Sequence, residues 1–148
     1  LDKDVEQSLV RVTTTYAFAE RWLVPRLPDF FDKHGDIRVE VETDDVVLDL
    51  RVDRLDLAIR YGPQVSANEE AAVLFSDRYI PVGLDQGLGL LLSSSALVDD
   101  GLQSGRYTQI PGPELRGFAY CLVLNPLSRN KQGVRTFADW IRQAAKKI

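Results

Sequence analysis

Hydroxyl-bearing and charged side chains follow three apolar segments in the first half of the sequence. The segments, residues 8–13, 37–41 and 55–60, have the alternation or the β-branched content of β-strands. The carboxyl ends of parallel strands open on one edge of a sheet, and ligands bind at that edge in open α/β proteins. We therefore predict one ligand site formed by Thr14, Thr15, Tyr16, Thr43, Asp44, Arg60, Tyr61 and Gly62.

The chemistry available at this edge suits a polar ligand. The hydroxyls of Thr14 and Thr15 can donate hydrogen bonds to a carboxylate, and the Arg60 guanidinium can pair with an acidic group if its side chain turns into the cleft. Structural roles compete with these. A threonine between a strand and a helix commonly caps the helix, and Arg60 can equally form a salt bridge on the surface or between domains. Both alternatives stay open on the sequence alone.

Catalytic groups and metal ligands are scarce. His34 is the single histidine and Cys121 the single cysteine, so the chain offers neither a Ser-His-Asp triad, nor a metal-ligand cluster, nor an intrachain disulfide. The acidic pairs Asp44-Asp45 and Asp99-Asp100 lie at predicted helix starts or polar faces, where adjacent side chains do not face each other. We expect no enzymatic activity, no cofactor and no metal.

Composition limits the class of protein. The 148 residues are 45% hydrophobic and 27% charged, which is typical of one globular domain. No apolar run approaches the roughly 20 residues that span a bilayer, so we expect no membrane partner. The formal net charge of −4 argues against direct binding to phosphate backbones. One cysteine fits a reducing compartment, and we expect a cytoplasmic protein.

Periodicity predicts alternating strands and helices. An apolar stripe from Phe18 to Phe31 predicts a helix after the first strand, and Thr43-Asp44-Asp45 can cap a second helix over residues 46–52. The resulting βαβαβ unit requires parallel strands with right-handed crossovers. Further along, we predict short strands at 73–75, 78–82, 90–92 and 117–124, and helices at 95–105 and 134–145.

Particular motifs resemble a known family. The run RWLVPRLPDF at 21–30, then HGDIRV at 34–39 and DLAIRYG at 56–62, resembles the effector-binding domain of LysR-type transcriptional regulators, most closely the glycine-cleavage-activator-like subgroup. The similarity resumes within 87–92, 97–107, 117–123 and 134–141. The resemblance implies an α/β fold of the periplasmic-binding-protein-like type II, with a parallel or mixed sheet, flanking helices, and two lobes that hold an effector between them.

The sequence departs from the family in the middle. The strand at 79–82 resembles a crossing strand that opens the second lobe, yet it is followed at once by what resembles the end of that lobe. The resemblance therefore implies that most of the second lobe is missing between about Val82 and Leu84. A deletion in the gene, a deliberately shortened lobe and an omitted stretch of sequence all account for this gap. Residues 1–81 and 117–148 would form the first lobe, and residues 82–116 a remnant of the second.

The resemblance implies a sensor of a small-molecule effector, with carboxylates among the candidates. Effector binding would favour one arrangement of lobes or subunits and reposition an attached winged helix-turn-helix, which lies outside this chain and would make the only DNA contact. The family also implies a homodimer or tetramer. The alternative is a solute-binding receptor of a transport system with the same fold, and an export signal in the gene would distinguish it.

Overall fold

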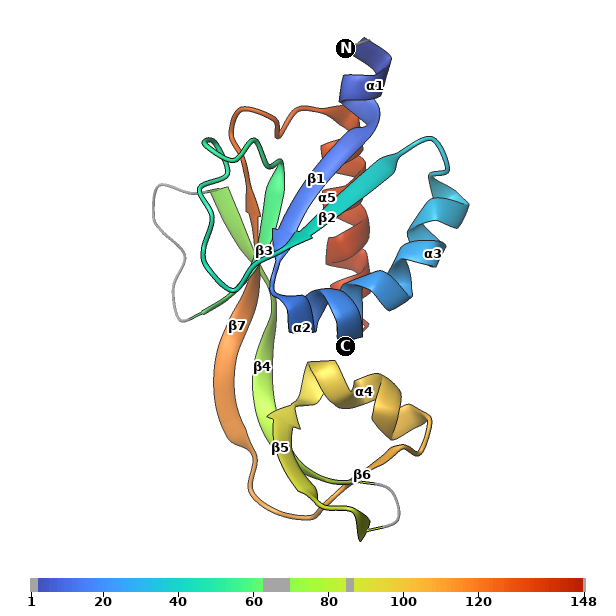
Figure 1. The fold of residues 1–148 in the computed structure, drawn as a ribbon, viewed down its shortest axis with the longest axis vertical. Helices are drawn as coiled ribbons and strands as arrows, with labels where there is room; N and C mark the ends of the chain where they lie inside the picture. Colours follow the sequence, from blue (N-terminus) through green and yellow to red (C-terminus); the bar gives the residue numbers. More distant parts are fainter. Residues whose placement is uncertain (1–2, 63–69, 85–86, 148) are drawn as a thin grey trace.

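The computed structural model describes residues 3–62, 70–84 and 87–147 (Figure 1). Its strands join in one mixed sheet with the order β2-β1-β3-β7-β4-β5, and β6 pairs with β4. The strands are β1 (Leu9–Thr14), β2 (Arg38–Thr43), β3 (Leu57–Gly62), β4 (Glu70–Leu84), β5 (Leu90–Ser94), β6 (Tyr107–Gln109) and β7 (Leu115–Leu124). The helices are α1 (Lys3–Ser8), α2 (Tyr16–Phe18), a π-helical turn η1 (Ala19–Leu23), α3 (Val24–Lys33), α4 (Ser95–Gln103) and α5 (Gln132–Ala145).

Strand β1 is the centre of the parallel part of the sheet. It pairs in parallel with β2 on one side and with β3 on the other, which confirms the predicted parallel arrangement. Strand β7 then runs antiparallel to β3, so the sheet is mixed. Because β1 and β3 end at the same edge, the loops that follow them open side by side.

The main core lies between the sheet and the helices α2, η1, α3 and α5. The predicted stripe is confirmed for Phe18, Trp22 and Phe30, which are fully buried, whereas Phe31 is 38% exposed at its margin. Each fully buried large side chain contributes about 1.5–3 kcal/mol. This aromatic core therefore holds the helical stretch 16–33 firmly against the sheet below the predicted site.

The helix predicted over residues 46–52 is wrong, because this segment forms bends and turns. The Asp44 Oδ1 accepts a hydrogen bond from the Val46 N–H at 2.9 Å, and the Asp49 Oδ1 accepts one from the Arg51 N–H at 2.9 Å. Short acidic side chains that bond nearby N–H groups compete with helix formation. The βαβαβ prediction thus holds for its strands but not for its second helix.

Strand β4 is one continuous strand where the sequence predicted two short ones. Its pairing with β7 is irregular between Val73 and Phe75 and again between Ser76 and Arg78, and the second irregularity falls where the prediction placed a break. Figure 1 shows β4 and β7 running side by side from the group formed by β1, β2, β3 and α5 to a smaller group formed by β5, β6 and α4. The smaller group has its own core of Ile80, Val82 and Val98.

Candidate functional site

A hollow lies at the carboxyl ends of β1 and β3, where the sequence places the site. Its volume is about 370 Å³, which includes open solvent at its mouth. The hollow is lined by residues 13–15 at the end of β1, residues 44–48 after β2 and residues 58–61 of β3. The structure therefore brings together five of the predicted residues, namely Thr14, Thr15, Asp44, Arg60 and Tyr61.

The two threonines have structural partners. Thr14 is 4% exposed, and its Oγ1 donates a hydrogen bond to the Ile59 carbonyl at 3.1 Å, which joins β1 to β3. The Thr15 Oγ1 accepts a hydrogen bond from the Phe18 N–H at 3.3 Å and so caps α2. Of the two roles that the sequence left open for Thr15, capping is the one observed.

Arg60 holds one wall of the hollow. Its Nη2 donates a hydrogen bond to the Leu48 carbonyl at 2.9 Å, so the guanidinium fastens the loop after β2 to strand β3. Asp44 is held at the end of β1, because its N–H donates to the Thr14 carbonyl at 3.0 Å. A basic and an acidic side chain thus border the same hollow, an arrangement suited to a polar ligand.

Tyr61 lines the hollow and extends toward β4 and β7, the two strands that connect the larger and the smaller group of elements. Its hydroxyl lies 3.1 Å from the Tyr79 hydroxyl and accepts a hydrogen bond from the Phe118 N–H at 2.9 Å. The hydrogen bond with Tyr61, followed by burial, raises the pKa of Tyr79 to about 12. A Cβ added at Gly117 would stand 2.8 Å from the Tyr61 hydroxyl, so a glycine is required for this approach.

Three predicted residues lie outside the lining of the hollow. Tyr16 begins α2 and is 61% exposed, Thr43 ends β2 opposite Thr14, and Gly62 ends β3. The sequence missed residues 45–48, which line the hollow because their segment is a loop and not the predicted helix. The signal for the loop was the pair of aspartates, Asp44 and Asp49, spaced to bond their own backbone.

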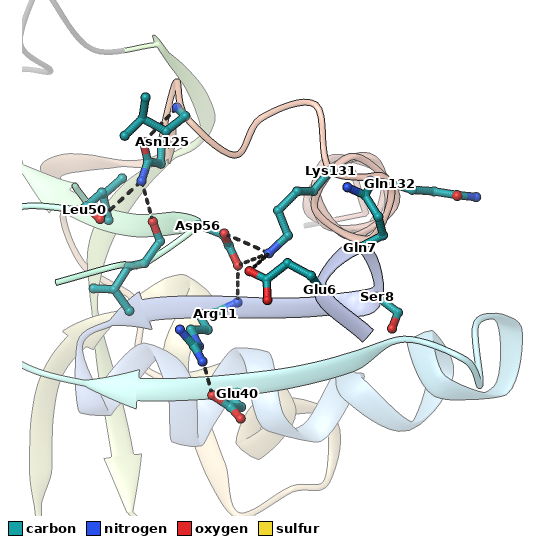
Figure 2. A network of polar contacts seen from close by, with 12 residues as sticks. Glu6, Gln7, Ser8, Arg11, Glu40, Leu50, Asp56, Asn125, Lys131 and Gln132 are labelled. Carbon is teal, nitrogen blue, oxygen red and sulfur yellow. Dashed lines mark hydrogen bonds and ion pairs between the residues drawn. The ribbon is translucent and has the colours of Figure 1, made fainter. Parts of the chain in front are cut away.

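The opposite end of β1 is fixed by a buried ion pair that the sequence did not reveal (Figure 2). Asp56 is 5% exposed; its Oδ2 accepts a hydrogen bond from the Arg11 N–H at 2.8 Å, and the Lys131 Nζ lies 3.4 Å from its Oδ1. Lys131 also pairs with Glu6 at 3.8 Å. This network therefore joins the N-terminal α1 and β1 to two segments much later in the sequence, the start of β3 and the start of α5.

Asn125 anchors the loop that precedes β3. Its Nδ2 donates hydrogen bonds to the Leu50 carbonyl at 3.2 Å and to the Leu55 carbonyl at 2.9 Å (Figure 2). The loop over residues 44–56 is thus tied at one end by Asn125 and at the other by Arg60. The wall of the hollow is held by side chains although it contains no helix.

Two further features concern residues 3–62, 70–84 and 87–147. Within these ranges, no group of three or more His, Cys, Asp or Glu side chains is placed to hold a metal ion. None of the helices there combines the length and the apolar character needed to cross a bilayer. Cys121 is buried, and burial raises the pKa of its thiol, which disfavours the reactive thiolate.

Comparison with known proteins identifies the family. The model of the LysR substrate binding domain matches residues 3–85. The AhcY transcriptional activator HvrB of Rhodobacter capsulatus is 23% identical over 203 residues, covering 98% of this chain and 69% of the relative. The effector domain of AmpR from Pseudomonas aeruginosa superposes with a TM-score of 0.79 at 18% identity, covering 94% of this chain and 96% of that one.

A second solved structure has the same fold. CrgA, a LysR-type transcriptional regulator from Neisseria meningitidis, superposes with a TM-score of 0.76 at 13% identity, covering 96% of this chain and 70% of that one. The predicted fold class is confirmed: an α/β domain with a mixed sheet and flanking helices, of the type II periplasmic-binding-protein-like kind. Because the family model matches more than half of its residues, the chain belongs to the LysR substrate-binding domain family.

Proposed function

We propose that this chain is the effector-sensing regulatory domain of a LysR-type transcriptional regulator, which transmits small-molecule binding to an attached helix-turn-helix. The family match over residues 3–85 carries this proposal, and the hollow at the carboxyl edge of β1 and β3 supplies a place for a ligand. A relative named as a transcriptional activator favours a regulator over the solute receptor of a transport system. The domain binds a ligand and performs no catalysis.

Signal transmission follows from the position of Tyr61. Tyr61 is among the residues that line the hollow, and its hydroxyl reaches Tyr79 on β4 and the Phe118 N–H on β7, the two strands that connect the groups of elements. A ligand that displaces or fixes Tyr61 changes the contacts that hold these strands together. The larger group of elements, β1, β2, β3 and α5, and the smaller one, β5, β6 and α4, can adopt different relative arrangements. The ligand favours the arrangement to which it binds more tightly, and the size of the shift is set by its difference in affinity between the arrangements.

The proposal divides the chain into residues 1–81 and 117–148, a first lobe, and residues 82–116, a remnant of the second. Two observations support a stretch missing near Val82–Leu84. The alignment with HvrB spans 203 residues whereas this chain has 148, so the relative has residues within the aligned region that the chain lacks. In addition, Leu90, Leu91 and Leu92 of the edge strand β5 are 42–78% exposed, as expected for a strand that has lost neighbours.

Finer features of the proposal come from the family resemblance. They are a glycine-cleavage-activator-like subgroup, a cytoplasmic homodimer or tetramer, and a carboxylate among the candidate effectors. DNA binding is assigned to the attached domain, because the net charge of this chain is −4.

A thermal-shift screen of amino acids, aromatic acids and other small carboxylates tests the proposal. We expect at least one compound to raise the unfolding temperature. At a ligand concentration of 100 Kd, binding adds about 2.7 kcal/mol to the free energy of unfolding. Arg60→Ala, which removes the hydrogen bond that fastens one wall of the hollow, should weaken this binding, whereas Arg135→Ala on the exposed face of α5 should not. Equal binding by both variants would exclude the hollow as the site.

A further inference from the structure

A buried carboxylate lies where β4 crosses between the two groups of elements. Asp77 is 5% exposed and sits at the irregularity between Ser76 and Arg78, where β-bulges redirect side chains. Its Oδ1 accepts hydrogen bonds from the Arg78 N–H at 2.8 Å and from the Ser95 Oγ at 3.4 Å. Its Oδ2 is buried and has no hydrogen-bond partner.

No cation compensates this carboxylate in the part of the chain that the structure describes. The neighbouring Arg78 directs its guanidinium to Glu114, with an Nη1–Oε2 distance of 2.9 Å. Buried carboxylates are normally paired or fully hydrogen-bonded, because removing a charge from water is costly. The open Oδ2 therefore marks a position at which a donor from outside the chain is expected.

Ser94 provides a second, independent sign of a binding position at the same junction. It is 6% exposed, it lies opposite Tyr79 in the pairing of β4 with β5, and its Oγ has no hydrogen-bond partner. The Tyr120 hydroxyl is a neighbour of this Oγ. Burial, and then the charge of Asp77, raise the pKa of Tyr120, so its phenol stays neutral beside the carboxylate.

The chemistry of this pair of orphan groups selects a class of ligand. An ionised carboxylate accepts hydrogen bonds and donates none, so it repels anions and attracts positively charged donors. The Tyr120 phenol, which stays neutral, adds no charge that would compete with the carboxylate for such a donor. We propose that Asp77 and Ser94 bind a cationic nitrogen of the effector, either a primary ammonium or a guanidinium group.

This inference rests on the proposed sensing function and adds to it that the effector carries a positively charged group. Asp77 belongs to the crossing strand β4, while Ser94 ends β5 and precedes α4. A nitrogen bound between them ties α4 to the crossing strand at the point where Tyr61 and Tyr79 also meet. An effector with this group therefore engages the elements that transmit the signal, and not only the hollow.

Paired probes test the inference on the purified chain. Phenethylamine, putrescine and agmatine are titrated beside the neutral N-acetylphenethylamine and N,N′-diacetylputrescine and beside the anions benzoate and acetate, with the unfolding temperature and Trp fluorescence as readouts. We expect at least one cation to bind and its neutral counterpart to bind at least about tenfold more weakly. The loss of one charge-assisted hydrogen bond accounts for a factor of this size.

Three variants complete the experiment. Asp77→Asn should weaken cation binding about tenfold or more while the ligand-free protein unfolds at an unchanged or higher temperature, because an unpaired buried charge is removed. Ser94→Ala should weaken it less, and Asp139→Asn, 79% exposed at its side chain, should leave it unchanged. Cation binding that persists in Asp77→Asn, or stabilisation by benzoate or acetate alone, overturns the inference and leaves effector sensing intact. A chain that no probe stabilises also contradicts the inference, whereas the proposed function is decided by the wider carboxylate screen.

Discussion

The contact between Asp56 and Lys131 shows how single residues determine the geometry of this domain. The side chains are 8% and 15% exposed, and they join the start of β3 to the start of α5 across 75 positions of sequence. Removing one partner of a buried pair leaves the other charge uncompensated. Lys131→Met should therefore lower the free energy of unfolding by about 3 kcal/mol, measured by urea denaturation.

A matched substitution separates this effect from the loss of any lysine. Lys147→Met, at an exposed position after α5, should change the free energy of unfolding by less than about 0.5 kcal/mol. Equal effects of the two substitutions would mean that the pair with Asp56 does not stabilise the fold.

The hydroxyl pair of Tyr61 and Tyr79 predicts a dependence on pH. The pKa of Tyr79 is raised from 10.0 to about 12, so the folded protein holds this proton more tightly than the unfolded chain does. The corresponding stability is fully present below pH 10 and is lost as the pH rises toward about 12. Unfolding curves at pH 9 and at pH 11.5 should show a smaller loss of stability in Tyr79→Phe than in the unsubstituted protein. An identical loss in both would place the titrating group elsewhere.

At the scale of elements, helix α5 packs closely against the junction of α1 and β1. A Cβ added at Gly133 would stand 2.8 Å from the Gln7 carbonyl oxygen and 3.2 Å from the Val10 Cγ2. Gly133→Ala should therefore destabilise the fold by about 1–3 kcal/mol, as overpacking does. Gly35→Ala is the control, since its added methyl would meet only the Phe31 carbonyl oxygen at 3.5 Å and should be nearly neutral. Thermal unfolding should show a lower unfolding temperature for Gly133→Ala than for Gly35→Ala, and equal temperatures would mean that the contact of α5 with α1 and β1 tolerates a methyl group.

Strand β5 forms an open edge of the sheet with exposed leucines. Leu90 is 78%, Leu91 42% and Leu92 53% exposed, and apolar edge strands promote association between chains. Leu91→Lys should reduce concentration-dependent self-association in light scattering or sedimentation. The same change at Leu127, which is 79% exposed in a loop, should not. If Leu91→Lys associates as much as the unsubstituted chain, this edge is not the contact surface.

Periodic elements could be predicted from sequence, and locally determined loops could not. The stripes of 18–31 and 134–145 and the alternation of β2 come from burial of one face, which a single sequence displays. The loop over 44–56 depends on Asp44 and Asp49 bonding their own backbone, a competition that favoured turns over the predicted helix. The role of Tyr61 was inaccessible as well, because its partner Phe118 is 57 residues away.

In the candidate site, too, the positions of the residues follow from the sequence pattern, whereas the contacts of their side chains do not. Strand direction brings Thr14, Thr15, Asp44, Arg60 and Tyr61 to one hollow, because the topology fixes which strand ends meet, and their binding of a ligand stays a prediction. The roles of the side chains depend on contacts that no spacing reveals. Thr15 caps a helix and Arg60 anchors a loop, and Asp77, which we assign to the ligand, was not singled out by any sequence motif.

At the scale of the whole molecule, the crossing strands β4 and β7 connect the hollow to the smaller group of elements (Figure 1). Tyr61 contacts both strands and Asp77 belongs to β4, so a ligand bound by either residue would bias their arrangement. A sensor of this kind acts by population shift, and its ligand changes the output only as far as it distinguishes the arrangements.

The central claim is that this domain converts ligand binding into a change of transcription. The most direct measurement is a promoter-reporter assay with the whole regulator, in which transcription is followed against the concentration of the compound that stabilises the purified chain. We predict a dose-dependent change whose midpoint shifts to higher concentration in Arg60→Ala, in proportion to the affinity lost by the purified variant. Transcription that stays constant while the compound binds would contradict the claim and show a binding domain without a regulatory output.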